Sequence, residues 1–314
     1  MSAKFILWEK MPYKSKRLLE QEAKIRSKTF FDPTYDIVFK EIFSKKETLI
    51  HFLNAILHLE DEAQIVSVEE RKPTVTLDTG VGEEQVRFDV HAKTKCGKFI
   101  DLEMQRASHE DFLDRVELYG SLLSINSKID MNRVLLRESQ KSNSYTMPTV
   151  YSIWLCNFSV EFCNSYHEEI GLYRASDVGN RGALPIYGKK KYILIDLTKF
   201  KADGKCSPEM EWLKLFTTMA DAKETPQDVD EVLKDVYERM LVAKSSNLFI
   251  SEVAQGMVTE AEIMTRIGTA HRTGFNEGAL DAKKKMAKQM LLEGLDQNRI
   301  ARISGLSEAE IRAL

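Results

Sequence analysis

The sequence predicts an α/β protein in which a central sheet is flanked by helices and followed by a helical C-terminal region. Three observations lead to this prediction. Apolar and polar side chains alternate through residues 86–106, as they do in strands with one buried face. Residues 30–59 carry apolar side chains at helical spacing, and the pattern from Pro208 onward is again helical.

The composition is typical of a globular protein and limits the function classes. The chain has 314 residues, of which 43% are hydrophobic and 30% charged, with a formal net charge of −3. It is long enough for one large domain or two. The small negative charge argues against indiscriminate binding of polyanions by the whole surface, although it allows a local basic patch.

The cysteine spacing and the length of the apolar runs indicate the cellular compartment of the protein. The cysteines, Cys96, Cys156, Cys163 and Cys206, form neither a CxxC pair nor a zinc-knuckle spacing. We therefore expect free thiols in a reducing compartment. The N-terminus lacks the apolar core of a signal peptide, and no apolar run reaches the roughly 18 residues of a membrane span. The expectation is a cytoplasmic protein without a membrane segment.

Residues 86–106 are predicted to form two short strands joined by a tight turn. The turn is Lys95-Cys96-Gly97, where glycine permits the left-handed backbone of a three-residue loop. Such a loop sets Phe88 opposite Met104, so that both strands present their apolar side chains on one face. A two-residue loop would instead place each apolar set opposite a polar one.

The same register places Asp89 opposite Glu103 on the polar face of the hairpin. Directly opposed residues have β-carbons about 5 Å apart, and like charges there are destabilising. Exposure to water or a bound cation must compensate. A hard divalent ion such as Mg²⁺, held by one or two carboxylates and otherwise hydrated, suits this pair. The alternative, from the pattern alone, is that both acids decorate the wet face of a surface hairpin.

Capping signals place the helices before this hairpin. Asp32-Pro33 begins a helix that carries Asp36 near its start. Asp36 either points toward a nearby site or only interacts favourably with the helix N-terminus. Ser44 with Glu47 forms a capping box for a second helix. The basic residues 1–28 form either a solvated leader helix or an arm that contacts phosphates.

Further strands and one helix complete the predicted core. We expect strands at Ile65–Glu70, Val75–Leu77, Thr149–Val160 and Lys191–Leu197, of which the last two extend the sheet of the hairpin. Ser108 with Asp111 caps a helix that runs through about Ser127. Arg115 and Tyr119 lie four residues apart on this helix and therefore share a face.

The C-terminal region is predicted to be helical throughout. A tract from about Glu252 to Leu292 contains the basic run Lys283-Lys284-Lys285, and two helices follow around Ser304-Gly305. Ser307 and Glu310 form a second capping box. This outline is that of helix-turn-helix DNA readers. Because the last helix holds acidic residues that repel phosphate, contact with a helical partner is favoured over DNA reading.

The order of these elements resembles the core of the PD-(D/E)xK nucleases. More narrowly, the chain resembles the Rpn family of recombination-promoting nucleases and PD-(D/E)xK transposases. The matching pieces are YDIVFKEIF (35–43), LIHFLNAIL (49–57), RFDVHAKTKCGKFIDLEMQ (87–105) and RVELYGSLL (115–123). The most specific feature is the strand with Glu103-Met104-Gln105 (EMQ) followed by the helix with Arg115 and Tyr119 (R-x-x-x-Y). The resemblance spans about residues 29–250.

The resemblance implies a fold and a division of the chain. The fold is a restriction-endonuclease-like core with a mixed central sheet flanked by helices. The expected parts are a basic N-terminal extension (1–28), the nuclease-like core (29–205), a helical continuation of the core (206–250) and a helical tail with a helix-turn-helix-like end (251–314).

The resemblance also implies hydrolysis of phosphodiester bonds in DNA with Mg²⁺ or Mn²⁺. By position, Asp89 and Glu103 would ligate the ion, with the main-chain carbonyl of Met104 as a further ligand and the side chain of Asp36 as a second-site or water-mediated ligand. Gln105 is the third expected catalytic residue. It stands where the wider superfamily has lysine, and a neutral amide can only hydrogen-bond, which leaves open the group that activates water.

The remaining implied roles concern substrate and partners. Arg115 and Tyr119 would contact the phosphate or Gln105, or else pack beneath the sheet. The expected partner is DNA, the expected assembly is a homodimer through helical regions, and the expected setting is recombination or mobile-element activity. The alternative is a nuclease fold whose catalysis has decayed and which serves as a DNA-binding or protein-assembly module.

Overall fold

The structure is a computed structural model that describes residues 14–71, 74–78, 83–108, 110–137, 145–177, 179–180, 182–202 and 206–312. The chain divides into two compact units, one up to Gly256 and one from Met257 onward.

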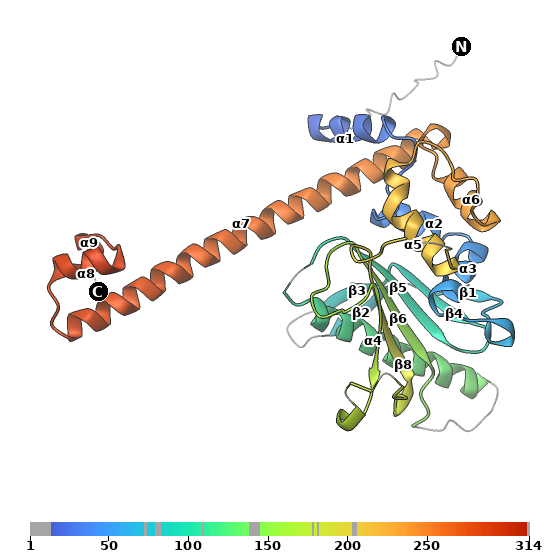
Figure 1. Ribbon diagram of the computed structural model, residues 1–314, viewed down its shortest axis with the longest axis horizontal. Coiled ribbons are helices and arrows are strands. Elements are labelled where there is room, and N and C mark those ends of the chain that lie inside the picture. The colour runs from blue at the N-terminus through green and yellow to red at the C-terminus, as the bar shows by residue number, and fades with distance from the viewer. Residues whose placement is uncertain are drawn as a thin grey trace, which may run out of the picture. The chain divides into compact units, whose positions relative to one another are not determined.

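The helices and strands of the first unit follow one another in a mixed order (Figure 1). The helices are α1 (Lys16–Arg26), α2 (Asp36–Ile42), α3 (Lys46–Ile56), α4 (Phe112–Arg137), α5 (Pro208–Thr218), α6 (Glu231–Arg239) and the start of α7 (Asn247–Leu292). The strands are β1 (Val68–Glu70), β2 (Thr74–Asp78), β3 (Glu83–Arg87), β4 (Val90–Thr94), β5 (Phe99–Gln105), β6 (Val150–Cys156), β7 (His167–Leu172) and β8 (Tyr187–Asp196).

The central sheet is mixed, as the resemblance implied. It has six strands in the order β1-β4-β5-β6-β8-β7, and β2 and β3 form a separate two-stranded sheet. The pairs β5–β6 and β6–β8 are parallel, while the outer pairs are antiparallel. The parallel β5–β6 pair is connected through α4, because parallel neighbours need a long crossover. The predicted strands around 149–160 and 191–197 therefore do extend the sheet of the hairpin.

Both faces of the sheet are covered. On one face, α4 packs Val116, Tyr119 and Leu123 into a cluster with Trp154 of β6 and Leu194 of β8. On the other face the alternate residues are also buried; they include Ile100, Leu102, Ile153, Leu155, Ile193 and Ile195. An aromatic cluster joins α2, α3 and α5; its members are Phe39, Phe43, Phe52, Trp212 and Phe216. The hairpin was predicted to have one buried and one water-exposed face. This is wrong for β5, because side chains on both of its faces are buried.

The predicted register of the hairpin is confirmed. Val90 pairs with Leu102, and the turn is closed by a 2.8 Å hydrogen bond from the Thr94 N–H to the Lys98 carbonyl. Gly97 has a φ of 81°, in the left-handed region that glycine tolerates best. Period-two patterning and turn length were thus sufficient to set this pairing.

The first strand of the predicted hairpin is interrupted. β3 ends at Arg87 and pairs with β2, whereas β4 begins at Val90. Phe88 consequently packs against Tyr119 on the α4 side, with ring centroids 5.6 Å apart, instead of facing Met104. The prediction that Phe88 lies opposite Met104 is therefore wrong. The aromatic ring packs under α4, and the strand is interrupted at this point.

Two helix boundaries and one strand differ from the predictions. Ser44 does not cap α3; its hydroxyl donates to the Glu41 carbonyl, and Lys45 occupies the cap position without a side-chain bond. Helix α4 begins at Phe112 and continues to Arg137, well past Ser127. The edge strand β7 was not predicted, because its sequence, HEEIGL, has little apolar alternation.

The second unit contains the rest of α7, followed by α8 (Gln297–Ser304) and α9 (Glu308–Arg312). Its core consists of Ala287, Ile300, Leu306 and Ile311. Gly305 ends α8 with a φ of 68°. The predicted capping box of α9 is confirmed, because the Ser307 N–H donates to Glu310 and the Glu310 N–H donates to the Ser307 hydroxyl.

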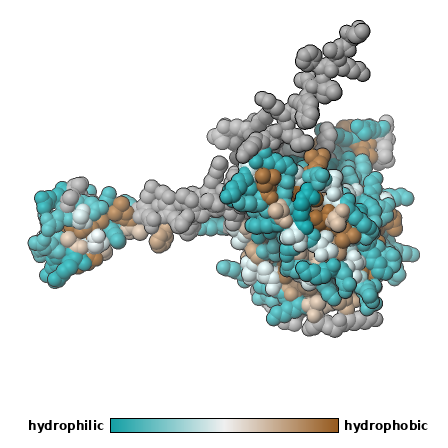
Figure 2. Space-filling model, turned by 90° about the horizontal axis from the view of Figure 1, so that it is seen from above, coloured by the Kyte–Doolittle hydropathy of each residue, from teal (hydrophilic) through white to brown (hydrophobic). Residues whose placement is uncertain are grey.

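The surface is mainly hydrophilic on the face shown in Figure 2, with hydrophobic side chains in small separate patches. In the described part of the chain, no helix combines the length and the apolar character that a membrane crossing requires.

Candidate active site

Asp89 and Glu103 lie at the point where the first strand of the hairpin is interrupted. The main-chain N–H of Asp89 donates to Glu103 Oε1 at 2.9 Å, and the main-chain N–H of Met104 donates to Asp89 Oδ2 at 3.0 Å. In an uninterrupted antiparallel ladder, main-chain carbonyls would accept such bonds. Because the strand is interrupted here, the Glu103 carboxylate accepts from the backbone of Asp89, and the Asp89 carboxylate accepts from the backbone of β5.

These acids are not surface decoration. Glu103 is 1% exposed, and the side chain of Asp89 is 14% exposed. Burial raises the pKa of Asp89 to about 6, although the ammonium of Lys40 opposes the rise. Burial and the charges of Asp101 and Asp89 raise the pKa of Glu103 well above its usual range.

A third carboxyl group, that of Asp101, joins this pair. Asp101 precedes Glu103 by two residues on β5, so both side chains point to the α4 face, and Asp101 is fully buried. Ser152 donates to one oxygen of Asp101, while the other oxygen receives no hydrogen bond from a described donor. Burial raises the pKa of Asp101, and its carboxyl lies within hydrogen-bonding reach of Glu103. Two such groups can be neighbours only with a shared proton or a cation between them.

Lys40 provides positive charge from α2. Its Nζ lies 3.1 Å from Asp89 Oδ1 and also forms an ion pair with Asp36, four residues earlier on the helix. Asp36 is largely exposed, and Lys40 forms ion pairs with both Asp36 and Asp89.

Gln105 and Met104 follow Glu103 at the end of β5. The Gln105 side-chain amide donates to the Ala107 carbonyl at 2.9 Å, which orients it toward the loop after the strand. Met104 contributes its N–H to Asp89, as described above. Both residues therefore lie beside the acidic pair, and the amide of Gln105 has a partner within its own loop.

Arg115 and Tyr119 approach Glu103 from α4. Arg115 Nη2 lies 3.9 Å from Glu103 Oε2 and donates to the Tyr119 hydroxyl at 3.1 Å. The guanidinium also lies over the Tyr119 ring, 5.0 Å from its centroid. The four-residue spacing predicted from the sequence does bring the two side chains together. Arg115 Nε is buried without a hydrogen-bond partner among the described residues.

The residues present fit a divalent cation. Asp89, Asp101 and Glu103 concentrate acidic groups in a buried place, and one Asp101 oxygen receives no hydrogen bond from the residues that the structure describes. A hard cation would offset this charge and use carboxylate oxygens as ligands. Among the described residues, neither Asp36 nor Asp101 joins Asp89 and Glu103 in a group of three whose donor atoms all lie within 4.8 Å of one another. The geometry therefore suits an ion held by the Asp89 and Glu103 pair and otherwise hydrated.

Two members of this site were not predicted from the sequence. Lys40 lies four residues after Asp36 on one helix face, and Asp101 shares the strand face of Glu103. Both spacings are visible in the sequence. Their importance depends on burial and on contacts between segments, which the spacing alone does not reveal.

Comparison with known families decides the assignment. A family model described as PD-(D/E)XK nuclease family transposase matches residues 33–250, which is more than half of the chain. The chain belongs to this family. A second model, described as the C-terminal HTH domain of the Rpn/YhgA-like nuclease family, matches residues 280–314 of this PD-(D/E)XK protein. No curated protein and no solved structure gives a significant match.

The two matches confirm the resemblance seen in the sequence. The PD-(D/E)XK family match contains Asp36, Asp89, Glu103 and Arg115. The HTH match contains α8 and α9. It identifies the C-terminal segment as a helix-turn-helix domain, the outline that the two-helix pattern had suggested.

Proposed function

We propose that this PD-(D/E)XK family protein is a metal-dependent DNA endonuclease that acts in recombination or mobile-element movement. The observation that carries the proposal is the buried pair of Asp89 and Glu103, whose carboxylates are positioned through hydrogen bonds to each other's strands. Paired carboxylates in a buried place suit Mg²⁺ or Mn²⁺. When bound, such an ion lowers the pKa of its water and stabilises charge on the phosphate.

The residues of the chain take distinct roles in this proposal. Asp89 and Glu103 hold the ion directly, with the Met104 carbonyl as a further ligand, and Asp36 reaches it through water. Gln105 hydrogen-bonds near the ion but brings no charge. Lys40 carries the positive charge that the superfamily lysine would bring, because its ammonium contacts Asp89. Arg115, with Tyr119 beside it, offers a guanidinium to the phosphate.

The C-terminal domain supports DNA as the substrate. Arg299 and Arg302 are exposed on α8, and the basic run before it exposes Lys283 and Lys285. These cations suit contacts to DNA phosphates, which position a protein without reading sequence. In α9, by contrast, Arg312 is paired with Glu308 at 2.8 Å. We therefore assign backbone contact to α7 and α8 and expect little base reading by α9.

A plasmid assay tests the proposal. Purified full-length protein is incubated with supercoiled plasmid and either Mg²⁺, Mn²⁺ or excess chelator, beside Asp89→Ala and the control Asp114→Asn. Asp114 is an exposed acid on α4. The proposal expects ion-dependent nicking or linearisation by the wild type and the control, and none by Asp89→Ala. Equal cutting by the wild type and by Asp89→Ala would contradict the proposed endonuclease function.

One observation favours a second function. The Gln105 amide donates to the Ala107 carbonyl, and Lys40 forms an ion pair with Asp89, so both groups have partners within the protein. Under this alternative the fold serves DNA binding or assembly without catalysis. It expects no cleavage with either ion, while a gel shift still detects DNA binding or light scattering detects a homodimer.

A further inference from the structure

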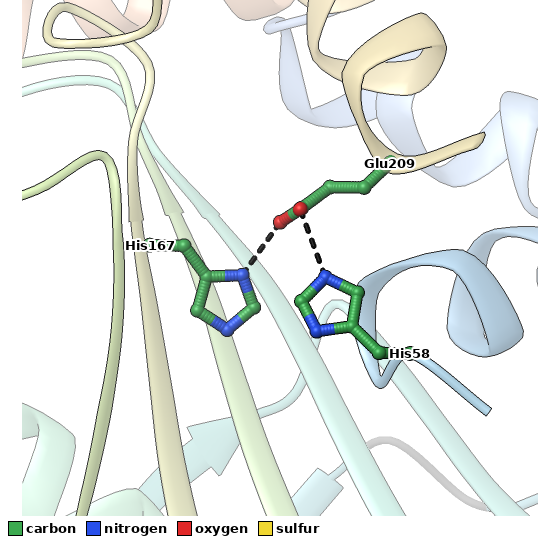
Figure 3. A group of neighbouring side chains, drawn as sticks. All are labelled: His58, His167 and Glu209. Carbon is green, nitrogen blue, oxygen red and sulfur yellow. Dashed lines mark hydrogen bonds and ion pairs between the residues drawn. The ribbon is translucent and has the colours of Figure 1, made fainter. Parts of the chain in front are cut away.

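A second cluster of ligand-type side chains lies outside the carboxylate site. His58 follows α3, His167 begins β7, and Glu209 lies in the first turn of α5. Figure 3 shows the two imidazoles turned toward the two oxygens of one carboxylate. His58 Nε2 lies 2.9 Å from Glu209 Oε2, and His167 Nδ1 lies 2.5 Å from Glu209 Oε1. Among the described residues, this is the group of three whose donor atoms all lie within 4.8 Å of one another.

The backbone at His58 is left-handed and ends α3. The Leu59 N–H donates to the Asn54 carbonyl and the His58 N–H donates to the Ala55 carbonyl, which is the Schellman pattern at a helix end. His58 occupies the left-handed position of this motif, with a φ of 49°. Glycine or asparagine is preferred there. A histidine in this position accepts backbone strain and gains a side chain aimed at Glu209.

Glu209 and His167, the other two members, are positioned by the helix and the strand that carry them. Glu209 is 4% exposed and follows Pro208 in the first turn of α5, where the helix dipole favours a carboxylate. The His167 side chain is 13% exposed, and His167 pairs with Ile195 of the central sheet. Its ring stacks on that of His58 with a centroid distance of 5.2 Å. Three separate elements thus hold the three donors in place.

We propose that His58, His167 and Glu209 form a binding site for a transition-metal ion of the zinc class. Two imidazole nitrogens and one carboxylate are one of the ligand sets of three-ligand zinc sites, whereas Mg²⁺ prefers oxygen ligands. Tetrahedral zinc with bonds of about 2.0–2.1 Å needs donor atoms roughly 3.3 Å apart. The three donor atoms already lie within 4.8 Å of one another. This site is independent of the Asp89 and Glu103 pair.

A neighbouring pocket leaves a coordination position open. His58 and Glu209 line a pocket of about 630 Å³, together with Glu47, His51 and Asn54. Sites with three protein ligands keep their fourth position for water or a ligand. The ion would therefore face the pocket on one side and join α3, β7 and α5 on the other.

Metal uptake tests the site directly. Chelator-treated full-length protein is dialysed against Zn²⁺, the bound metal is counted by mass spectrometry, and the thermal midpoint is recorded with and without Zn²⁺. The key variant is His58→Asn, because asparagine keeps the left-handed backbone and removes the imidazole. Glu47→Gln is the matched control, since Glu47 is an exposed acid on the same pocket. A double variant, Asp89→Ala with Glu103→Ala, removes the carboxylate pair.

The proposal expects one tightly bound zinc per chain in the wild type, the Glu47→Gln control and the double variant, with a raised thermal midpoint in each. Zinc affinity should fall at least 10-fold in His58→Asn, because even residues that only support a metal ligand change affinity by about 10- to 100-fold. The site would be refuted by a wild type that takes up no zinc, by a His58→Asn variant that binds as tightly as the wild type, or by loss of zinc in the double variant alone.

Discussion

The main-chain N–H of Asp89 donates a 2.9 Å hydrogen bond to the carboxylate of Glu103. The reciprocal bond runs from the N–H of Met104, next to Glu103, to Asp89 Oδ2. Each acid is therefore oriented by the strand that carries the other. The pair cannot separate without breaking both bonds, so the metal site that we propose is positioned before an ion arrives.

Replacing Glu103 with glutamine should remove cleavage and keep the fold. The amide can still accept the Asp89 N–H, but the negative charge that would hold the ion is lost. We expect ion-dependent plasmid cutting to fall at least about 100-fold, since residues that merely support a ligand already account for 10- to 100-fold. The free energy of unfolding should stay the same or rise, because burial beside Asp101 and Asp89 disfavours a charged Glu103 and the amide is neutral. The control is Glu110→Gln, at an exposed acid before α4; cutting by Glu103→Gln at the control's rate would contradict the assignment.

Replacing Lys40 with methionine should destabilise the ion-free protein. Lys40 lies 3.1 Å from Asp89, and without its ammonium that buried carboxylate loses its cation. We expect the free energy of unfolding to fall by about 1–3 kcal/mol in chelator. Added Mg²⁺ should recover more stability in Lys40→Met than in the wild type. Chemical denaturation with and without Mg²⁺ measures both effects, with the exposed Lys46→Met as the control; equal stability of the two variants in chelator would show that the ion pair is unimportant.

Asp196, at the end of β8, should give a pH-dependent contribution to stability. Burial opposes its ionisation, but hydrogen bonds from Thr198 and from the Val160 N–H outweigh burial and lower the pKa of Asp196. A lowered pKa means that its contribution is complete above the unfolded pKa of about 3.9 and is lost as the pH falls below it. Asp196→Asn should therefore reduce the free energy of unfolding by about 1–3 kcal/mol at neutral pH and by less near pH 3. Denaturation curves at both pH values test this, and a difference that grows toward acid pH would contradict it.

Gly120 lets α4 approach the sheet closely. A Cβ at this position would lie 2.3 Å from Cε1 of Tyr192, within the ring and not at a flexible end. Gly120→Ala should therefore lower the free energy of unfolding by about 1–3 kcal/mol from overpacking, even though alanine favours the helix by about 1 kcal/mol. In a Tyr192→Ala background, the same change should be neutral or stabilising. A thermal-denaturation double-mutant cycle measures the coupling, and an equal effect in both backgrounds would show that the contact does not matter.

Local patterns were sufficient for much of this protein. The register of the hairpin, the turn at Gly97, the capping box at Ser307 and the shared face of Arg115 and Tyr119 are all borne out. Each depends on residues close in the chain, where periodicity, turn length and spacing determine the geometry. The nuclease family was also recognisable from the order of motifs, and the family match confirms it.

Only the tertiary structure decided which side chains meet. Packing of Phe88 under α4 interrupts the first strand at Asp89, and the cover of α4 buries Asp101 and Glu103 on the face that alternation alone predicted to be wet. Lys40 reaches Asp89 from α2, and His58 meets His167 and Glu209 from distant parts of the chain. Burial and contacts of this kind arise when separate elements pack together, so no period within one element encodes them.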